Sequence, residues 1–407
     1  MLYLDIYTLL KQSFSQKKDN SFVPELDIAM SHYPFTSADA KQMLPGSDSL
    51  FCSKHDHAFD DVEQGGTGEN TIVDVTDHEI KENNSFKYTI VRKAGQERAN
   101  GAIILLHGLN EKTWDKYLPW AYKLTQDTGK AVILFPIAFH MDRAPEVWSD
   151  RKLMFAVAEE REKRSRDNTQ CSYVNAAISS RMDANPQRLF WSGMQTYSDI
   201  IRLADDIKAN KVPEISSDAS IDLFGYSIGS FLALILMMGN PKNIFDNSRL
   251  FCFCGGMTID RMFPVSRYIM DAHAAVTMQK SFAQFLNSNF ATDGRLGHYQ
   301  DTELHPEESW FKTMVCYNHF QKEREKRFGE LATRIKAVVL EKDEVAPPAE
   351  ALNTLQGGYR NIKVEVDIQD FNHPYTHMVP FPLTQKFKEE INASFEDTMK
   401  KAAAFLG

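Results

Sequence analysis

The chain has few cysteines, no long apolar run and no excess of positive charge. Its five cysteines are odd in number and scattered through 407 residues, which argues against a disulfide framework and favours reduced thiols. No stretch approaches the roughly 18 to 20 uncharged apolar residues that a membrane-spanning helix needs. The 46 Lys and Arg residues against 55 Asp and Glu residues give a formal charge of -9, which disfavours a nucleic-acid partner.

The beginning of the chain also lacks the order of a secretory signal. Asp5 lies among the first apolar residues and Lys11 follows them, whereas a signal places its positive charge first. We therefore expect a cytoplasmic protein. Because 43% of the residues are hydrophobic, a disordered, collagen-like or coiled-coil chain is excluded, and a large packed core is expected.

Residues 1–70 show no sustained hydrophobic period and carry polar clusters, so we predict an N-terminal extension with a short helix near Asp5 to Phe14. Four residues in its second half are of metal-binding types: Cys52, His55, His57 and Asp60. Their spacing matches no standard zinc pattern, and no downstream motif completes one. We expect a solvated loop there, and neither a metal nor an organic cofactor for the protein.

A regular alternation of strands and helices is predicted from about residue 71. Ile72 to Ile80 and Phe86 to Val91 are rich in β-forming residues and are separated by a polar turn, which suits a hairpin. Six further strand candidates follow: 102–106, 131–135, 221–225, 250–254, 335–340 and 364–368. Apart from the last, which alternates as an edge strand does, they are continuous apolar runs typical of buried parallel strands.

Helical periods occur between these strands, and the chain closes on a helix with Phe387, Ile391 and Phe395 on one stripe. The predicted fold class is therefore α/β, a mostly parallel eight-stranded sheet with helices on both faces. Two connections, at about 140–196 and 258–332, are too long for simple crossovers. They are predicted to be helical insertions that cover one end of the sheet.

The most specific motif is Gly225-Tyr226-Ser227-Ile228-Gly229, which joins an apolar strand to an apolar helix. This G-x-S-x-G pattern in a strand-turn-helix context indicates a nucleophile elbow, in which small residues let the strand and helix approach closely. Ser227 is the predicted nucleophile.

An acid and a histidine follow the serine in the order that this arrangement requires. Asp343 lies directly after the strand 335–340 and is preferred over its acidic neighbours Glu341 and Glu344. Two histidines follow the last strand. We favour His373 as the base because it lies five residues past the strand end, and we keep His377 as the alternative.

The oxyanion that develops during acyl transfer needs backbone N–H donors after the nucleophile and in the loop after the third strand. Ile228 is the predicted first donor, and Leu109, in His107-Gly108-Leu109-Asn110, is the predicted second. His107 is expected to be structural.

Through His107-Gly108, the Gly225 to Gly229 motif, Asp343 and His373, residues 71–407 resemble the α/β-hydrolase superfamily and are similar to uncharacterised bacterial members. The resemblance implies a lid in the 258–332 insertion, which follows the sixth strand. The insertion carries apolar residues that we expect on its underside: Met262, Phe263, Tyr268, Met270, Met278, Phe282, Phe285 and Phe290.

The expected function is a serine hydrolase that cleaves an ester or related acyl bond of a small-molecule substrate through an acyl-enzyme. Acyl transfer and thioester cleavage use the same groups and remain open. The other class is a non-catalytic binding protein on a hydrolase scaffold, since a fold does not determine a function.

Overall fold

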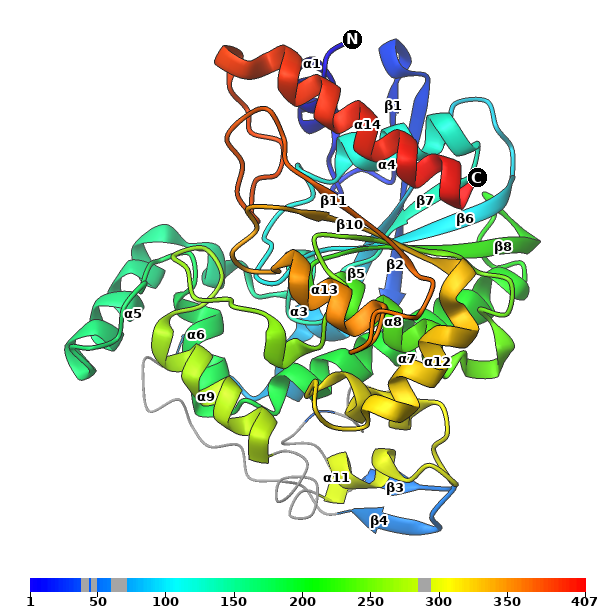
Figure 1. Ribbon diagram of the computed structural model, residues 1–407. Coiled ribbons are helices and arrows are strands. Elements are labelled where there is room, and N and C mark those ends of the chain that lie inside the picture. Colours follow the sequence, from blue (N-terminus) through cyan, green and yellow to red (C-terminus); the bar gives the residue numbers. More distant parts are fainter. Residues whose placement is uncertain (38–43, 45–49, 60–71, 285–293) are drawn as a thin grey trace.

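The computed structural model describes residues 1–37, 44, 50–59, 72–284 and 294–407, and the following account concerns these residues (Figure 1). Its centre is a nine-stranded sheet in the order β1-β2-β5-β7-β6-β8-β9-β10-β11. The strands are β1 (Asn20–Val23), β2 (Ile28–Thr36), β5 (Ser85–Lys93), β6 (Ala99–Leu106), β7 (Ala131–Leu134), β8 (Ile215–Tyr226), β9 (Leu250–Phe253), β10 (Ile335–Leu340) and β11 (Glu365–Gln369).

The sheet is antiparallel at one end and parallel elsewhere. Neighbouring strands pair antiparallel from β1 through β2 and β5 to β7. From β7 onward, through β6, β8, β9 and β10 to β11, each strand pairs parallel with the next. The six strand candidates from 102–106 to 364–368 are confirmed, and the alternating last candidate is the edge strand β11.

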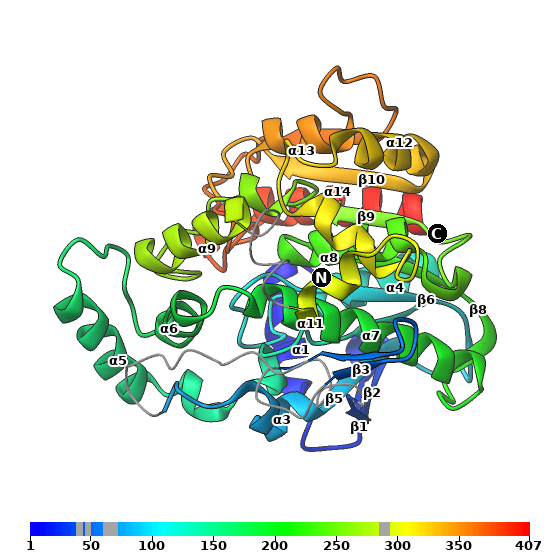
Figure 2. The same ribbon diagram turned by 90° about the horizontal axis from the view of Figure 1, so that it is seen from below.

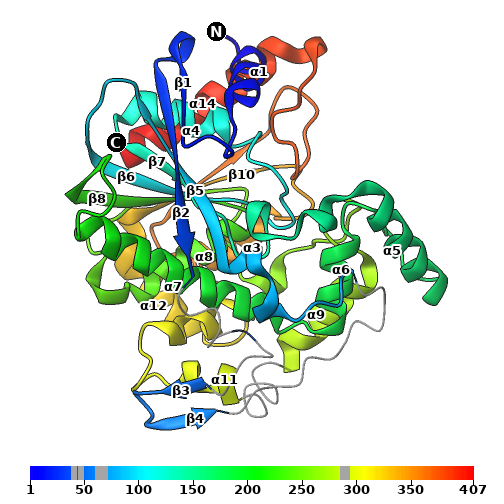
Figure 3. The ribbon, with the colours of Figure 1, turned by 180° about the vertical axis from the view of Figure 1, so that it is seen from behind.

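Helices cover both faces of the sheet because its central strands are apolar on both sides. One face carries α1 (Tyr3–Ser13), α4 (Leu118–Thr128) and α14 (Lys388–Leu406) (Figures 1 and 3). The other carries α7 (Arg188–Lys208), α8 (Ile228–Gly239), α12 (Gln321–Leu331) and α13 (Pro348–Leu355). Within β6 the alternation is visible directly, since Ile103 and Leu105 pack toward the first group and Ile104 and Leu106 toward the second.

The predicted hairpin of 72–80 with 86–91 is wrong. Residues 72–80 contain only turns and a short 3-10 helix, Asp77–Glu79, which is followed by α3 (Lys81–Asn84). β5 pairs with β2 along its whole length, from Ile28 opposite Lys93 to Thr36 opposite Ser85. The segment predicted as an N-terminal extension therefore contributes β1 and β2 to the sheet. It also contains helix α1, which confirms the short helix expected near its start.

The first of the two long connections carries α5 (Arg151–Arg164) and α6 (Ala176–Ala184), and the second carries α9 (Ala272–Gln284), α11 (Gly294–Gly297) and α12. Helices α5, α6 and α9 of these connections lie together on one side of the molecule (Figures 1 and 2). No helix among the described residues is both long and apolar enough to cross a membrane.

The strand order, the single change from antiparallel to parallel pairing, and the sharp turn from β8 into α8 together define an α/β-hydrolase fold. In such a sheet the carboxyl ends of the parallel strands meet at one edge, where functional side chains gather. The loops after β6, β8, β10 and β11 all leave this edge.

Candidate active site

Ser227 lies at the turn between β8 and α8 in a strained backbone conformation, with φ 56° and ψ −122°. Residues in such sparsely populated regions cost about 1–3 kcal/mol and occur preferentially at functional sites. The flanking glycines make the turn sterically possible. A Cβ on Gly225 would collide with the backbone of Ser230, and one on Gly229 would collide with the carbonyl oxygen of Leu106.

A continuous hydrogen-bond chain joins Ser227 to a histidine and an acid. The hydroxyl of Ser227 donates to Nε2 of His377 at 2.8 Å, and Nδ1–H of His377 donates to Oδ2 of Asp343 at 2.7 Å. All three residues are buried. The other carboxylate oxygen of Asp343, Oδ1, accepts from the backbone N–H groups of Val345 and Ala346 at 2.9 and 2.8 Å. Asp343 is thereby fixed, and it determines the histidine tautomer whose Nε2 can accept a proton.

The structure places His377, the alternative base, next to Ser227, and it does not bring His373, the preferred one, into contact with that serine. Nδ1–H of His373 donates to the carbonyl oxygen of its own neighbour Pro374 at 3.1 Å, and its ring packs against Phe371 at 5.2 Å between centroids. His377, four residues further on, occupies the place between Asp343 and Ser227. Distance from the strand end could not separate the two histidines, because the path of their common loop decides which ring reaches the serine.

The loop that carries His377 is anchored by residues that the sequence analysis did not single out. The hydroxyl of Tyr226 donates to the carbonyl oxygen of His377, and the two rings stack with centroids 5.5 Å apart. The ammonium of Lys116 donates to the carbonyl oxygen of Met378 at 3.1 Å and pairs with Glu111. These bonds fix the backbone at His377 and Met378 and thereby position the imidazole.

The same network reaches the loop after β6. The hydroxyl of Tyr117 donates to Glu111 at 3.0 Å and accepts from the backbone N–H of Gly108 at 2.9 Å. His107, at the end of this strand, is satisfied on both ring nitrogens: Nδ1–H donates to Gly108 O at 2.8 Å, and Nε2 accepts from Ile137 N–H at 2.9 Å. Burial lowers the pKa of His107 well below its ordinary value, so the ring is neutral and holds the loop shape.

Leu109 and Ile228, the two expected oxyanion donors, line the same small pocket as Ser227. The pocket is narrow, and most of its lining comes from the second insertion: Ile259, Met262, Pro264, Ile269, Ala275, Met278, Gln279 and Phe282. The apolar underside expected for this insertion is thus present at three of the residues named for it, Met262, Met278 and Phe282.

The remaining residues named for that underside behave differently. Met270 is buried, whereas Phe263 and Tyr268 are exposed. Phe285 and Phe290 lie outside the described residues, as does Asp60 of the sequence motif near Cys52. Among the described residues of the insertion, those that line the pocket lie between Ile259 and Phe282.

The two insertions are joined to each other by buried polar contacts. Arg161 on α5 forms a bidentate pair with Asp271, just before α9, at 2.6 and 3.0 Å. Burial raises the pKa of Asp271, but the bonds from Arg161 lower it, and the net pKa lies below its ordinary value. The side-chain amide of Asn110, next to Leu109, donates to the carbonyl oxygens of Val174 and Tyr268, one in each insertion. The pocket wall is consequently tied to the loop after β6.

The sequence comparisons identify the family. A profile of the family of unknown function DUF6051 matches residues 1–407. The chain belongs to DUF6051. A search of curated proteins gave no match for this DUF6051 chain.

Several solved structures are similar to this DUF6051 chain. The esterase Est22 has 12% sequence identity and a TM-score of 0.46, over 99% of this chain and 85% of Est22. Carboxyl esterase 2 from the mycorrhizal fungus Tuber melanosporum has 10% identity and a TM-score of 0.41, over 79% and 81% of the two chains. A thermostable esterase from Pseudomonas putida has 13% identity and a TM-score of 0.41, over 80% of each chain. Similarity at this level concerns the fold alone. The description of the site depends on the interatomic distances in this structure.

Proposed function

We propose that this DUF6051 chain is a serine hydrolase that cleaves an ester or related acyl bond. The observation that carries the proposal is the unbroken hydrogen-bond chain from Asp343 through His377 to Ser227, at the strained turn between β8 and α8. A buried serine with this orientation of base and acid has what an acyl-transfer nucleophile requires.

In the proposed reaction, Oγ of Ser227 attacks the acyl carbonyl carbon while its proton passes to Nε2 of His377. Asp343 accepts Nδ1–H throughout and stabilises the imidazolium that forms. The negative charge on the former carbonyl oxygen is stabilised by the N–H groups of Leu109 and Ile228. Nε2–H then protonates the leaving group as the bond to the acyl carbon breaks. Water then attacks the carbonyl carbon of the acyl-enzyme while Nε2 of His377 takes its proton. The bond to Oγ of Ser227 breaks, Nε2–H returns the proton to Oγ, and the acid is released.

The lining of the pocket favours an apolar acyl group of small or medium size. Its walls beyond Ser227 are Leu109, Met262, Met278 and Phe282 among other apolar side chains, with Gln279 as a polar one. Burial of each CH₂ group of a substrate contributes about 0.8 kcal/mol, until the chain exceeds the space available. The Arg161–Asp271 pair between the two insertions, and the bonds from Asn110 to both, limit how far this wall can move.

Labelling by a fluorophosphonate probe tests the proposal without knowledge of the substrate. We expect the folded wild-type protein to be modified at Ser227, and the Ser227→Ala variant to lose labelling and at least about 10³-fold in kcat on any ester the parent cleaves. Ser217→Ala, at an exposed serine on the same strand, is the matched control and should behave as wild type. Folded wild-type protein that resists the probe would instead favour a binding protein on a hydrolase scaffold.

A further inference from the structure

A second group of reactive side chains lies outside the hydrolase site, where the β3–β4 hairpin meets the second insertion. β3 (Leu50–Cys52) and β4 (His57–Phe59) form a separate two-stranded sheet, with Cys52 opposite His57. The hairpin packs beside α11 and two short 3-10 helices, His298–Gln300 and Glu308–Met314 (Figure 1). It lies apart from the nine-stranded sheet.

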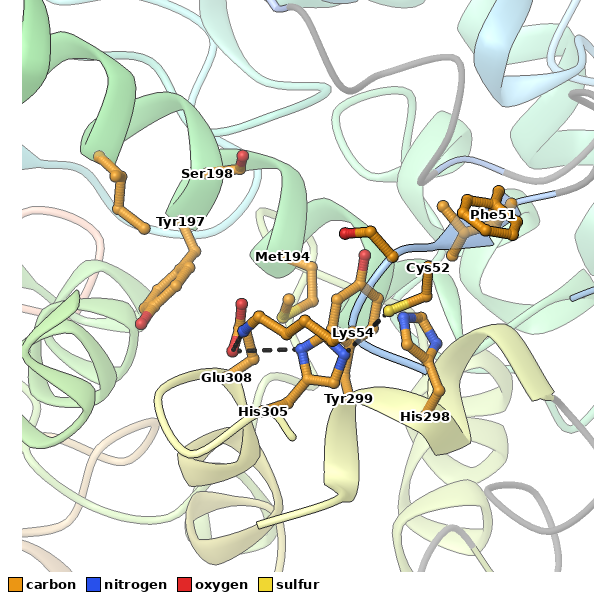
Figure 4. Close-up of a pocket in the computed structure, with 13 residues that line it drawn as sticks. Phe51, Cys52, Lys54, Met194, Tyr197, Ser198, His298, Tyr299, His305 and Glu308 are labelled. Atoms are coloured by element: carbon orange, nitrogen blue, oxygen red, sulfur yellow. Dashed lines mark hydrogen bonds and ion pairs between the residues drawn. The ribbon is translucent and has the colours of Figure 1, made fainter. Parts of the chain in front are cut away.

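The side chains of Cys52, His298 and His305 converge at this junction, and the ring of His55 contacts all three. We call these four residues the Cys52–His305 cluster. The sulfur of Cys52 and one ring nitrogen each of His298 and His305 all lie within 4.8 Å of one another, and these three residues are buried. Figure 4 shows the side chains of Cys52, His298 and His305 pointing toward one another at the wall of a pocket.

The two sulfur-to-nitrogen distances in the cluster are close to those across one edge of a tetrahedral metal site. Sγ of Cys52 lies 3.3 Å from Nε2 of His305 and 3.5 Å from Nδ1 of His55. With Zn–S near 2.3 Å and Zn–N near 2.0–2.1 Å, the sulfur-to-nitrogen edge of a tetrahedron is about 3.6 Å. Thiolate and imidazole are the ligands that Zn²⁺ prefers, and a set of one cysteine and three histidines fills four positions.

The ring nitrogen of each histidine that faces away from the cluster lies near an oxygen, on the side where metal-binding histidines have their second-shell acceptor. Nδ1 of His305 lies 3.4 Å from Oε2 of Glu308, and Nε2 of His55 lies 3.5 Å from Oδ2 of Asp301. Nδ1–H of His298 donates to a backbone carbonyl, that of Gly294, at 3.3 Å, which leaves Nε2 as its ligand atom.

A carboxylate or carbonyl on the far nitrogen fixes the tautomer and raises the basicity of the near one. The charges also suit a dication. A Cys52 thiolate and the carboxylates of Asp301 and Glu308 would surround it, with Lys54 the nearby cation, 3.6 Å from Glu308.

We propose that the Cys52–His305 cluster binds one borderline-soft divalent cation of the Zn²⁺ class. Its ligands are Cys52, His55, His298 and His305. Cys52, His298 and His305 are already grouped, and His55, 3.5 Å from the sulfur, supplies the fourth ligand. With four protein ligands no position stays open, so the ion is structural. It joins a hairpin near the start of the chain to a segment about 250 residues later. A two-stranded hairpin with three residues in each strand is marginal by itself, and the metal supplies the missing crosslink.

Cobalt substitution tests the site independently of any hydrolase activity. Full-length protein is stripped with a chelator, and Co²⁺ or Zn²⁺ is titrated back. We expect one ion per chain, visible d–d bands of tetrahedral intensity, and a near-ultraviolet thiolate-to-cobalt charge-transfer band. Zn²⁺ should displace Co²⁺, raise Tm and slow alkylation of Cys52 by iodoacetamide.

Two variants at the site and one control make the test specific. Cys52→Ser should abolish the charge-transfer band, and both it and His305→Ala should weaken metal binding by at least about 10- to 100-fold. Cys316→Ser, at a partly exposed cysteine on another part of the insertion, should bind as wild type. Circular dichroism of each metal-free variant establishes that it is folded.

The proposal is overturned if folded wild-type protein binds less than stoichiometric metal at millimolar concentration. It is equally overturned if Cys52→Ser keeps the cobalt spectrum, or if Zn²⁺ leaves the alkylation rate of Cys52 unchanged, which would identify a metal-free thiol-imidazole pair. None of these readouts depends on Ser227, so the hydrolase proposal and the metal proposal fail separately.

Discussion

Replacement of Asp343 by asparagine gives a sharp test of the site because the structure fixes the orientation of the new amide. Oδ1 of Asp343 accepts two backbone N–H groups, from Val345 and Ala346, and only an oxygen can stay there. The NH₂ group of the introduced asparagine must therefore point at Nδ1 of His377, where Oδ2 of the aspartate now accepts. An NH₂ group can only donate to Nδ1, so the proton of the neutral ring moves to Nε2.

That tautomer cannot accept the proton of Ser227, because Nε2 now carries a hydrogen of its own. In other hydrolases with this arrangement, the wrong tautomer costs about 10⁴-fold in kcat. At 1.36 kcal/mol for each factor of ten, this corresponds to about 5 kcal/mol of transition-state stabilisation. The fold should be nearly unaffected, since the substitution keeps the side-chain shape and both backbone hydrogen bonds.

The rate of fluorophosphonate labelling at Ser227 and kcat on short p-nitrophenyl esters measure the effect, and the denaturant midpoint measures the fold. Glu344→Gln, at the exposed neighbouring acid, is the control and should keep wild-type rates. An Asp343→Asn protein that is folded and labels within about tenfold of wild type would refute the assigned role of Asp343 and the tautomer argument with it.

The remaining predictions concern the base, the pocket and the insertions. His377→Ala should reduce kcat by about 10³-fold or more, whereas His373→Ala should stay within about tenfold of wild type. The reverse result would identify His373 as the general base. Across an ester series, kcat/KM should peak at a short or medium acyl chain, and Phe282→Ala should move the peak to longer chains; an unchanged profile would remove Phe282 from the acyl wall. Arg161→Met leaves a buried carboxylate unpaired and should lower the free energy of unfolding by about 3–5 kcal/mol in denaturant titrations, against little change for the exposed Arg164→Met.

Local patterns predicted much of the fold and part of the site. The strands from 102–106 onward, the edge position of the last strand and the apolar stripe of α14 all follow from hydrophobic period within a short window. The first strands do not follow from such a pattern, because β2 pairs with β5, from Thr36 opposite Ser85 to Ile28 opposite Lys93, and no local signal specifies a pairing over that separation. The β-rich composition of 72–80 indicated a strand, yet the edge of β5 is already occupied by β2.

By itself the sequence determined the Ser227 turn, since the glycines at 225 and 229 are dictated by steric contact between adjacent elements. It also determined the order of serine, acid and histidine. Only the tertiary structure decided that His377 rather than His373 reaches Ser227, and that Cys52 meets His298 and His305. The physical reason is the same in both cases. Hydrophobic period and turn chemistry act between near neighbours, whereas the path of a loop and the meeting of distant segments depend on how the whole chain packs.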